Sequence, residues 1–232
     1  MAAMLLAALV AGCRAGHIPN PNDPRDAGPL TIGLIQERLQ DASRVLVRRE
    51  ANGEITPVQS KDYIAVRANE LLPWLDPAPM KERDAWQYGD VYLAARRWAD
   101  AKKAIELALR HPISPDRRVG DTLRLAHVQA ELGKVDEALK TANSVVDVPD
   151  YLRPQILPAV LYDLAPAVQG KGHDAELAKL IERAIKAHET ALVDPNTPGG
   201  RAYQLATPFH VRRARMKIAE LTASAQAQAP RR

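Results

Sequence analysis

The stretch DAWQYGDVYLAARRWADAKKAIELALRHP, Asp84 to Pro112, decides the fold. Its apolar side chains recur every three or four residues on both sides of Arg96-Arg97, which is the spacing of two amphipathic helices joined by a turn. Small and large residues alternate at the positions where the two helices would meet: Gly89, Tyr92, Trp98, Ala101, Ile105 and Ala108. The small residues allow a close approach and the large ones fill the remaining space, so the stretch predicts a helical hairpin.

The same pattern recurs in TLRLAHVQAELGKVDEALKTANSVVDVP, Thr122 to Pro149. Equivalent positions are held by Leu125, Ala126, Gly133, Val135, Ala138, Ala142 and Val145. Gly133 suits the turn because glycine readily adopts the left-handed conformation that ends many helices. Ala101 and Ala138 lie 37 residues apart, so the two hairpins predict consecutive units of a helical array.

The two hairpins resemble the tetratricopeptide repeat, a helix pair of about 34 residues. The resemblance implies that residues 78–226 form a right-handed stack of antiparallel helix pairs, in which the first helix of each pair lines a concave surface that binds a peptide or a partner helix. A third, degraded unit is expected from Tyr151 to Leu192, with a kink at Pro166. After a loop over 194–200, a capping helix is expected to begin at Thr207-Pro208, and residues 227–232 are expected to form a disordered tail.

Composition favours an all-α fold. Aromatic residues make up 4% of the chain, and alanine and leucine dominate the apolar set, which favours helices over sheet. Residues 31–77 predict an N-terminal helical region, with one helix through about Leu46 and another from Ser60, as N-cap, to Pro73. A short β-hairpin around Asn52-Gly53 is the alternative for the first of these helices.

The chain begins with an apolar segment from Ala2 to Gly12. As a helix it spans about 16 Å, too short to cross a bilayer but typical of a signal peptide. Val10-Ala11-Gly12-Cys13 resembles the lipobox of bacterial lipoproteins. The resemblance implies that residues 1–12 are removed, that Cys13 is acylated, and that residues 13–30 form a Pro-rich spacer. Arg14 after the cysteine favours the outer membrane. The alternative is a free cysteine beside a frayed terminus.

The repeat resemblance also assigns residues to the partner-facing side of the stack. Carried over position by position, these are Arg83, Trp86, Asp90, Leu93, Leu123, His127, Ala130 and Glu131, with Tyr162 extending the surface. Trp86 is expected to contribute most, because a large aromatic side chain gains most from a partner. For each position, ordinary packing or solvation is the alternative.

Sequence motifs of the common enzyme classes are missing. The chain contains no HExxH, no phosphate-binding loop, no Gly-x-Ser-x-Gly and no dinucleotide fingerprint. His127 and Glu131 have the spacing of two metal ligands, although a solvated polar pair is the commoner meaning, and His188 is expected to be an exposed helix residue. We therefore expect no enzymatic activity, no cofactor and no metal; a hydrolase or cell-wall enzyme on a helical frame is the alternative.

Positive charge is concentrated at the C-terminal end. Residues 201–232 hold seven Lys and Arg residues against one Glu, a net charge of +6 in a chain whose total is +4. The cluster consists of Arg212, Arg213, Arg215 and Lys217. It predicts a solvated basic helix face, with anionic phospholipid or an acidic partner as alternatives. Nucleic acid is not expected, because the run lacks interleaved aromatic residues for stacking.

These features together predict a lipid-anchored scaffold or adaptor of the cell envelope, facing the periplasm or the exterior. It would bind other proteins and no small-molecule substrate. The alternative is a constitutive structural accessory subunit of a membrane protein complex.

Overall fold

The computed structural model describes residues 28–228, so the apolar N-terminal segment, Cys13, most of the spacer and residues 229–232 lie outside the described part. The α-helices are α3 (Ile32–Ala51), α4 (Pro57–Leu71), α5 (Ala85–Ala94), α6 (Trp98–Arg110), α7 (Pro115–Glu131), α8 (Val135–Asn143), α9 (Ile156–Ala159), α10 (Ala165–Val168), α11 (Asp174–Glu189) and α12 (Pro198–Gln228). Shorter elements are the 3-10 helices η1 (Leu72–Trp74), η2 (Glu82–Asp84) and η3 (Asp150–Leu152), and the π-helical η4 (Val160–Leu164).

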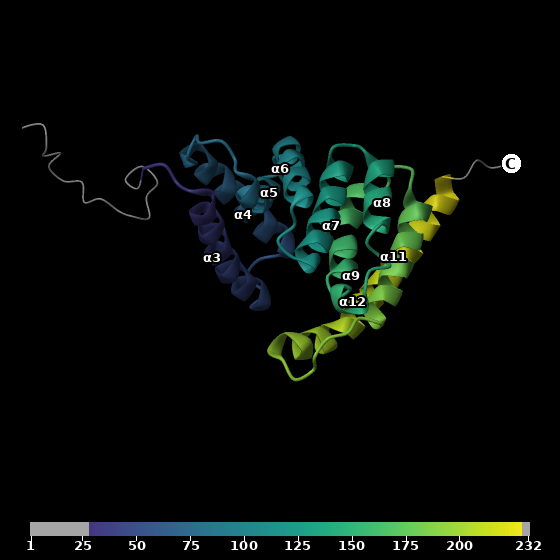
Figure 1. The fold of residues 1–232 in the computed structure, drawn as a ribbon. Coiled ribbons are helices and arrows are strands. Elements are labelled where there is room, and N and C mark those ends of the chain that lie inside the picture. The colour runs from purple at the N-terminus through teal and green to yellow at the C-terminus, as the bar shows by residue number, and fades with distance from the viewer. Residues whose placement is uncertain (1–27, 229–232) are drawn as a thin grey trace, which may run out of the picture.

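The all-α prediction is confirmed for the described part of the chain. It contains no β-strand, and one isolated bridge joins Leu30 to Leu75. Neighbouring helices pack against each other in chain order, α5 with α6, α6 with α7, and α7 with α8 (Figure 1). Within the described residues, no helix is both long enough and apolar enough to cross a bilayer.

The N-terminal region is helical, and the β-hairpin alternative is wrong. A single helix, α3, continues to Ala51, with the Thr31 hydroxyl accepting from the Leu34 amide at its start. The second helix begins at Pro57 rather than after Ser60, because Thr56 and Gln59 form a reciprocal capping box ahead of it. Ser60 is therefore buried inside α4 and does not cap it.

The first predicted hairpin is α5–α6, and its turn lies at the predicted Arg96-Arg97. Arg96 has φ +58°, the one positive φ among the described non-glycine residues. The two helices lie so close that a Cβ added to Gly89 would sit 2.9 Å from Ile105 Cγ1. Ala101 is fully buried at the same contact. A small residue at position 89 is therefore a steric requirement of this hairpin.

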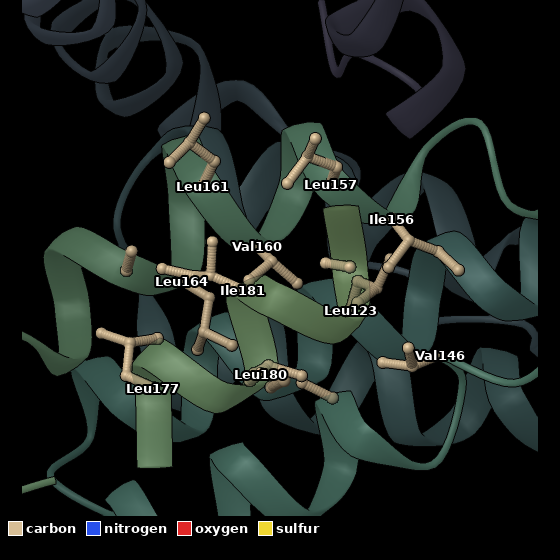
Figure 2. Packing of buried hydrophobic residues seen from close by; sticks show 14 of the residues in the cluster. Leu123, Val146, Ile156, Leu157, Val160, Leu161, Leu164, Leu177, Leu180 and Ile181 are labelled. Atoms are coloured by element: carbon tan, nitrogen blue, oxygen red, sulfur yellow. The ribbon is translucent and has the colours of Figure 1, made fainter. Parts of the chain in front are cut away.

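The second hairpin is α7–α8, with Gly133 at φ +79° in its turn, as predicted. Ala138 on α8 is fully buried. The core then widens toward the C-terminus, where side chains from α7, η4 and α11 meet (Figure 2). Leu157, Leu161 and Leu164, from the segment expected to form the third unit, are all buried in it.

The irregularity expected at Pro166 takes the form of the π-helical η4, which ends directly before α10. Proline has no amide hydrogen, and its ring clashes with the carbonyl four residues earlier in an α-helix. Widening of the preceding turn relieves this clash. A kink was predicted at this place, and the structure shows how the chain accommodates the proline.

The start predicted for the last helix is wrong. Helix α12 begins at Pro198, nine residues before Thr207, and Pro208 lies inside it. The Thr197 hydroxyl accepts from the Gly200 amide at 3.0 Å, as an N-cap does. Figure 1 shows α12 changing direction along its length, as expected for a helix with an internal proline. Helix α12 also includes residues 227 and 228, which were assigned to a disordered tail.

The contact at Gly89 gives a stability prediction. Gly89→Ala adds a methyl group against the buried Ile105 side chain. We expect the overpacking to outweigh the gain of about 1 kcal/mol in helix propensity, and the free energy of unfolding to fall by about 1 kcal/mol net. Urea unfolding followed by circular dichroism measures the change.

Gly199→Ala is the matched control. No atom lies within 4 Å of the position its Cβ would take, so this substitution is expected to leave stability unchanged or slightly raised. A Gly89→Ala variant as stable as Gly199→Ala would contradict the close approach of α5 and α6.

Candidate functional site

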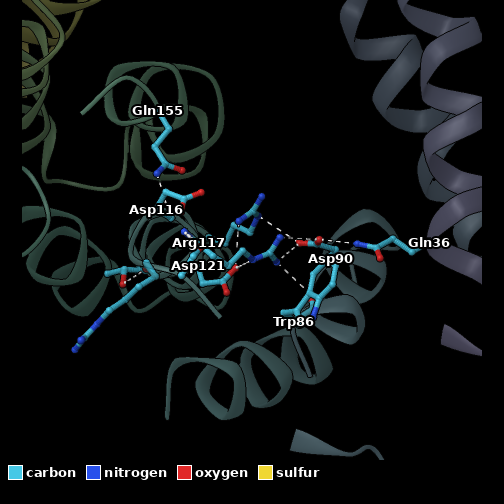
Figure 3. A network of polar contacts seen from close by, with 11 residues as sticks. Gln36, Trp86, Asp90, Asp116, Arg117, Asp121 and Gln155 are labelled. Atoms are coloured by element: carbon cyan, nitrogen blue, oxygen red, sulfur yellow. Dashed lines mark hydrogen bonds and ion pairs between the residues drawn. The ribbon is translucent and has the colours of Figure 1, made fainter. Parts of the chain in front are cut away.

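Most of the predicted partner-facing residues fall into three groups in the structure: an internal polar network, the hydrophobic core, and a partly exposed polar surface. Asp90 on α5 belongs to the first group (Figure 3). Its carboxylate accepts from Gln36 Nε2 at 2.9 Å and from both terminal nitrogens of Arg117 at 2.8 and 3.1 Å. Asp90 thereby joins α3, α5 and α7.

Arg117 is the centre of this network, with a side chain that is 16% exposed. Its guanidinium also pairs with Asp121 at 2.9 Å and lies over the Trp86 ring, 4.8 Å from the ring centroid. Burial lowers the pKa of Arg117, but Asp90 and Asp121 oppose this and leave it above its ordinary value. Burial raises the pKa of Asp121, although Arg117 and Arg124 act in the opposite sense.

Two carboxylates and two guanidiniums thus compensate one another in a partly desolvated site. Arg124 completes the set, 3.1 Å from Asp121 and 3.5 Å from Asp90. Trp86 and Asp90 are therefore engaged inside the protein. The expectation that Trp86 contributes most to partner binding stays a prediction, and the Arg117 guanidinium leaves the other face of its ring to a partner.

Two further predicted residues lie in the core. Leu123 and Ala130 are buried by their neighbours, so their assignment to the partner-facing side is wrong. Leu93 is half-buried and packs with the cluster around Val128. Arg83 is exposed and lies 3.5 Å from the neighbouring Asp84. None of these residues joins the partly exposed polar surface described next.

The remaining three, His127, Glu131 and Tyr162, come together with two residues that the sequence analysis missed, Lys61 and Asp163. His127 Nε2 lies 3.4 Å from Glu131 Oε1. Lys61 pairs with Asp163 at 3.1 Å. We call these five residues the polar surface; they are contributed by α4, α7 and η4.

Pro166 explains how Lys61 reaches this surface. In a regular helix the amide of residue 166 would donate to the carbonyl of Tyr162, but proline has no such hydrogen. The freed carbonyl accepts instead from Lys61 Nζ at 3.2 Å. Lys61, about one hundred positions earlier in the chain, thus contacts η4 through both the Tyr162 carbonyl and the Asp163 carboxylate.

Aromatic contacts hold the other members in place. The His127 ring packs on Trp98 with 5.5 Å between ring centroids. Tyr162 shares a hydrogen bond of 2.9 Å with His210 Nδ1, and the Arg213 guanidinium lies 5.7 Å from its ring centroid. Burial lowers the pKa of His127, although Asp163 and Glu131 oppose the shift.

His188 was expected to be exposed, and this prediction is wrong. It is 1% exposed, because it continues the buried stripe of α11 formed by Leu177, Ile181 and Ala184. His188 Nδ1 lies 2.8 Å from Tyr203 Oη and Nε2 lies 3.3 Å from Thr207 Oγ1, so both partners come from α12. Burial and the nearby His210 lower the pKa of His188 to about 4.

The basic cluster lies on α12. Arg212, Arg213 and Arg215 are exposed, whereas Lys217 is half-buried and contacts Glu220 and Gln169. Arg215 lies 3.5 Å from Glu189. Within residues 28–228, no group of three or more His, Cys, Asp or Glu side chains is arranged to hold a metal ion.

Comparison with protein-family models, with curated proteins and with solved structures gave no match to this chain.

Replacement of Arg117 is expected to lower the stability of the protein strongly, because its side chain is mostly buried between two carboxylates. Arg117→Met leaves Asp90 and Asp121 without their main cation, and the free energy of unfolding should fall by about 3 kcal/mol. Arg118→Met is the control, because the adjacent Arg118 side chain is exposed on the same helix, and a change below about 0.5 kcal/mol is expected there. Equal effects in chemical denaturation would contradict the structural role of Arg117.

His188 makes stability depend on pH. Its pKa is about 4 in the folded protein and about 6.5 in the unfolded chain, so the unfolded state binds the proton first. Stability contributed by neutral His188 is fully present above pH 6.5 and is lost as pH falls toward 4, by up to about 3 kcal/mol. His188→Gln should flatten the loss over this range of pH.

His111→Gln is the matched control, because the His111 side chain is exposed. Thermal unfolding at a series of pH values compares the variants with the parent protein. If His188→Gln and His111→Gln have the same pH dependence as the parent protein, His188 is not titrating as a buried group.

Proposed function

We propose that the protein is a lipid-anchored, all-helical adaptor of the bacterial cell envelope that binds other proteins through the polar surface. One observation carries the proposal: the fold brings His127, Glu131 and Tyr162 together with Lys61 and Asp163. Three of these five residues are among the nine that the repeat resemblance assigned to a partner-facing side.

The chemistry of the polar surface suits recognition of another protein. It presents both signs of charge and an aromatic ring, and tyrosine and arginine are enriched at the energetic centres of interfaces. The side chains are held in place before binding, Tyr162 by His210 and Lys61 by the carbonyl that Pro166 leaves free. Prior ordering reduces the entropy lost on association.

The proposal includes a tetratricopeptide-like arrangement. The hairpins α5–α6 and α7–α8 would be successive units of a right-handed stack, with α9–η4–α10 and α11 as a third, degraded unit. Helices α3 and α4 would extend the stack at the N-terminus, and α12 would cap it. The contacts of α6 with α7 and of α7 with η4 support this order.

The lipid anchor is the second part of the proposal. Acylation of Cys13 and the Pro-rich segment after it would hold the helical domain near a membrane, the outer membrane in a Gram-negative cell. The spacer would end before Leu30, which is buried in the helical domain. Restriction to a surface raises the effective concentration of the domain toward partners in the same membrane. The role requires no cofactor, no small-molecule substrate and no catalysed reaction.

A constitutive structural subunit of a membrane complex is the alternative. Helices α3 and α4 expose large apolar side chains, at Val45, Val47, Val58, Tyr63 and Val66. A permanent assembly would cover such residues. A Cys13→Ser chain that stays monodisperse in solution favours the adaptor, whereas one that aggregates without its assembly favours the subunit.

Photocrosslinking in cells tests the adaptor directly. A photoreactive amino acid at Glu131 is expected to give a discrete adduct with an envelope protein. The same amino acid at Lys103, an exposed position on α6, should give none. His127→Ala combined with Tyr162→Ala should remove the Glu131 adduct. Adducts of equal yield from both positions, or none from Glu131, would contradict partner binding at the polar surface.

Intact-mass analysis of the membrane fraction tests the anchor separately. The expected species begins at Cys13 and carries acyl chains. An unmodified chain that begins at Met1 would exclude the anchor while leaving the adaptor surface to be judged by crosslinking.

A further inference from the structure

Helix α12 carries two stripes of side chains on opposite faces. The inner stripe follows a four-three-four spacing and turns toward the rest of the protein: Tyr203, Thr207, His210, Ala214 and Leu221. Its members contact His188 and Tyr162 or are buried in the core. The outer stripe has the same spacing and consists of Leu205, Phe209, Arg212 and Met216. At about 100° per residue, the two stripes lie on opposite sides of the helix.

The outer stripe is apolar and exposed. Leu205 is 83% exposed, Phe209 49% and Met216 60%. Leu205 is the most exposed large apolar side chain in the described part of the chain. The inner stripe provides the contacts that dock α12, whereas much of the outer stripe stays exposed; Phe209 also contacts the His210 ring, with 5.9 Å between the centroids. Contiguous exposed apolar side chains of this kind mark interaction sites.

Arginines border the outer stripe on both sides. Arg213 and Arg215 lie about 80° to either side of it on the helix, and Arg212 lies within it. All three are exposed. Glu189 is 3.5 Å from Arg215, but the Arg215 side chain remains 69% exposed, so its charge still reaches the surroundings. Long arginine side chains can lie along an apolar surface while the guanidinium meets phosphate groups.

We propose that the outer face of α12 lies on an anionic phospholipid surface, with Leu205, Phe209 and Met216 at the level of the acyl chains and Arg212 and Arg215 at the headgroups. Arg213 stays with the Tyr162 ring, 5.7 Å from its centroid. An apolar stripe one helix wide, with basic residues along both edges, is the pattern of an interfacial helix. Charge complementarity favours anionic lipid as the occupant. The proposal stands without the proposed function, since no residue of the polar surface takes part in it.

Membrane contact through α12 would fix how the polar surface is presented. His210 on the inner stripe holds Tyr162, so the side of α12 that carries the polar surface is opposite the side that meets lipid. The first part of α12 also extends beyond the neighbouring helices (Figure 1). This leaves room for an approach to a flat surface.

Environment-sensitive fluorescence locates the contact. Cys13→Ser removes the one cysteine of the chain, so that Leu205→Cys in the full chain can be labelled uniquely with a nitrobenzoxadiazole dye. Vesicles of phosphatidylcholine with phosphatidylglycerol are expected to shift its emission to the blue, and pure phosphatidylcholine vesicles to shift it much less. A dye at Lys103→Cys should not respond. No shift at position 205, or an equal shift at position 103, would overturn the proposal.

Vesicle sedimentation measures the contribution of charge. Arg212→Gln with Arg215→Gln should lower partitioning onto the mixed vesicles about 25-fold, because each basic side chain at an anionic surface contributes about fivefold. Lys103→Gln with Lys140→Gln removes the same charge from exposed positions on α6 and α8 and should have little effect. The apolar N-terminal segment is common to all variants. Equal losses in the two pairs would overturn a specific contact through α12.

The remaining occupants of this face are a second copy of the chain and a protein partner. Leu205→Ser with Phe209→Ser should lower vesicle binding at least tenfold while circular dichroism and the unfolding midpoint stay unchanged. If the parent chain is instead a dimer in lipid-free solution and this variant is a monomer, the outer face is a protein interface and the membrane proposal fails.

Discussion

Close approach of α5 and α6 is the constraint on which the rest of the structure depends. The Gly89 backbone lies against Ile105, and a methyl group at position 89 would be 2.9 Å from that side chain. This contact orients α5 so that Asp90, the next residue, points away from α6 toward Gln36 and Arg117. The hairpin thus supplies the carboxylate that joins the N-terminal helices to α7. The close contact at Gly89 and the partly buried ionic network at Asp90 therefore lie on adjacent residues of one helix.

A second constraint joins distant parts of the chain at the polar surface. Pro166 prevents one backbone hydrogen bond and leaves the Tyr162 carbonyl to Lys61. The same segment widens into a π-helical turn, a feature that often occurs at functional sites. Asp163 then pairs with Lys61, while Tyr162 is held by His210 and Arg213. The irregular segment at Pro166 therefore lies where side chains from α4, η4 and α12 meet.

Periodicity predicted the hairpins, the glycine turn at Gly133 and the all-α class, because these depend on local spacing. Periodicity did not predict which side chains are buried where helices distant in the sequence pack together. Leu123 and Ala130 were placed on a surface that their neighbours cover, and the contact of Arg117 with the Trp86 ring could not be foreseen from spacing. His188 continues the buried stripe of α11 and was recognisable from its spacing. The sequence analysis placed the start of α12 too late because Thr197, Pro198 and the two glycines after it have the composition of a loop. Proline is nevertheless common in the first turn of a helix.

Hydrogen exchange followed by mass spectrometry on Ala101→Leu tests the central claim most directly. Ala101 is fully buried beside Ile105 in a cluster that α5, α6 and α7 share, and leucine there overpacks the contacts of α6 with both neighbours. If this contact orients Asp90 and hence α7, exchange should accelerate in α5, α6 and α7 together, and in α3 through Gln36. Acceleration confined to the first turn of α6, with α3 and α7 exchanging as in the parent protein, would contradict the account.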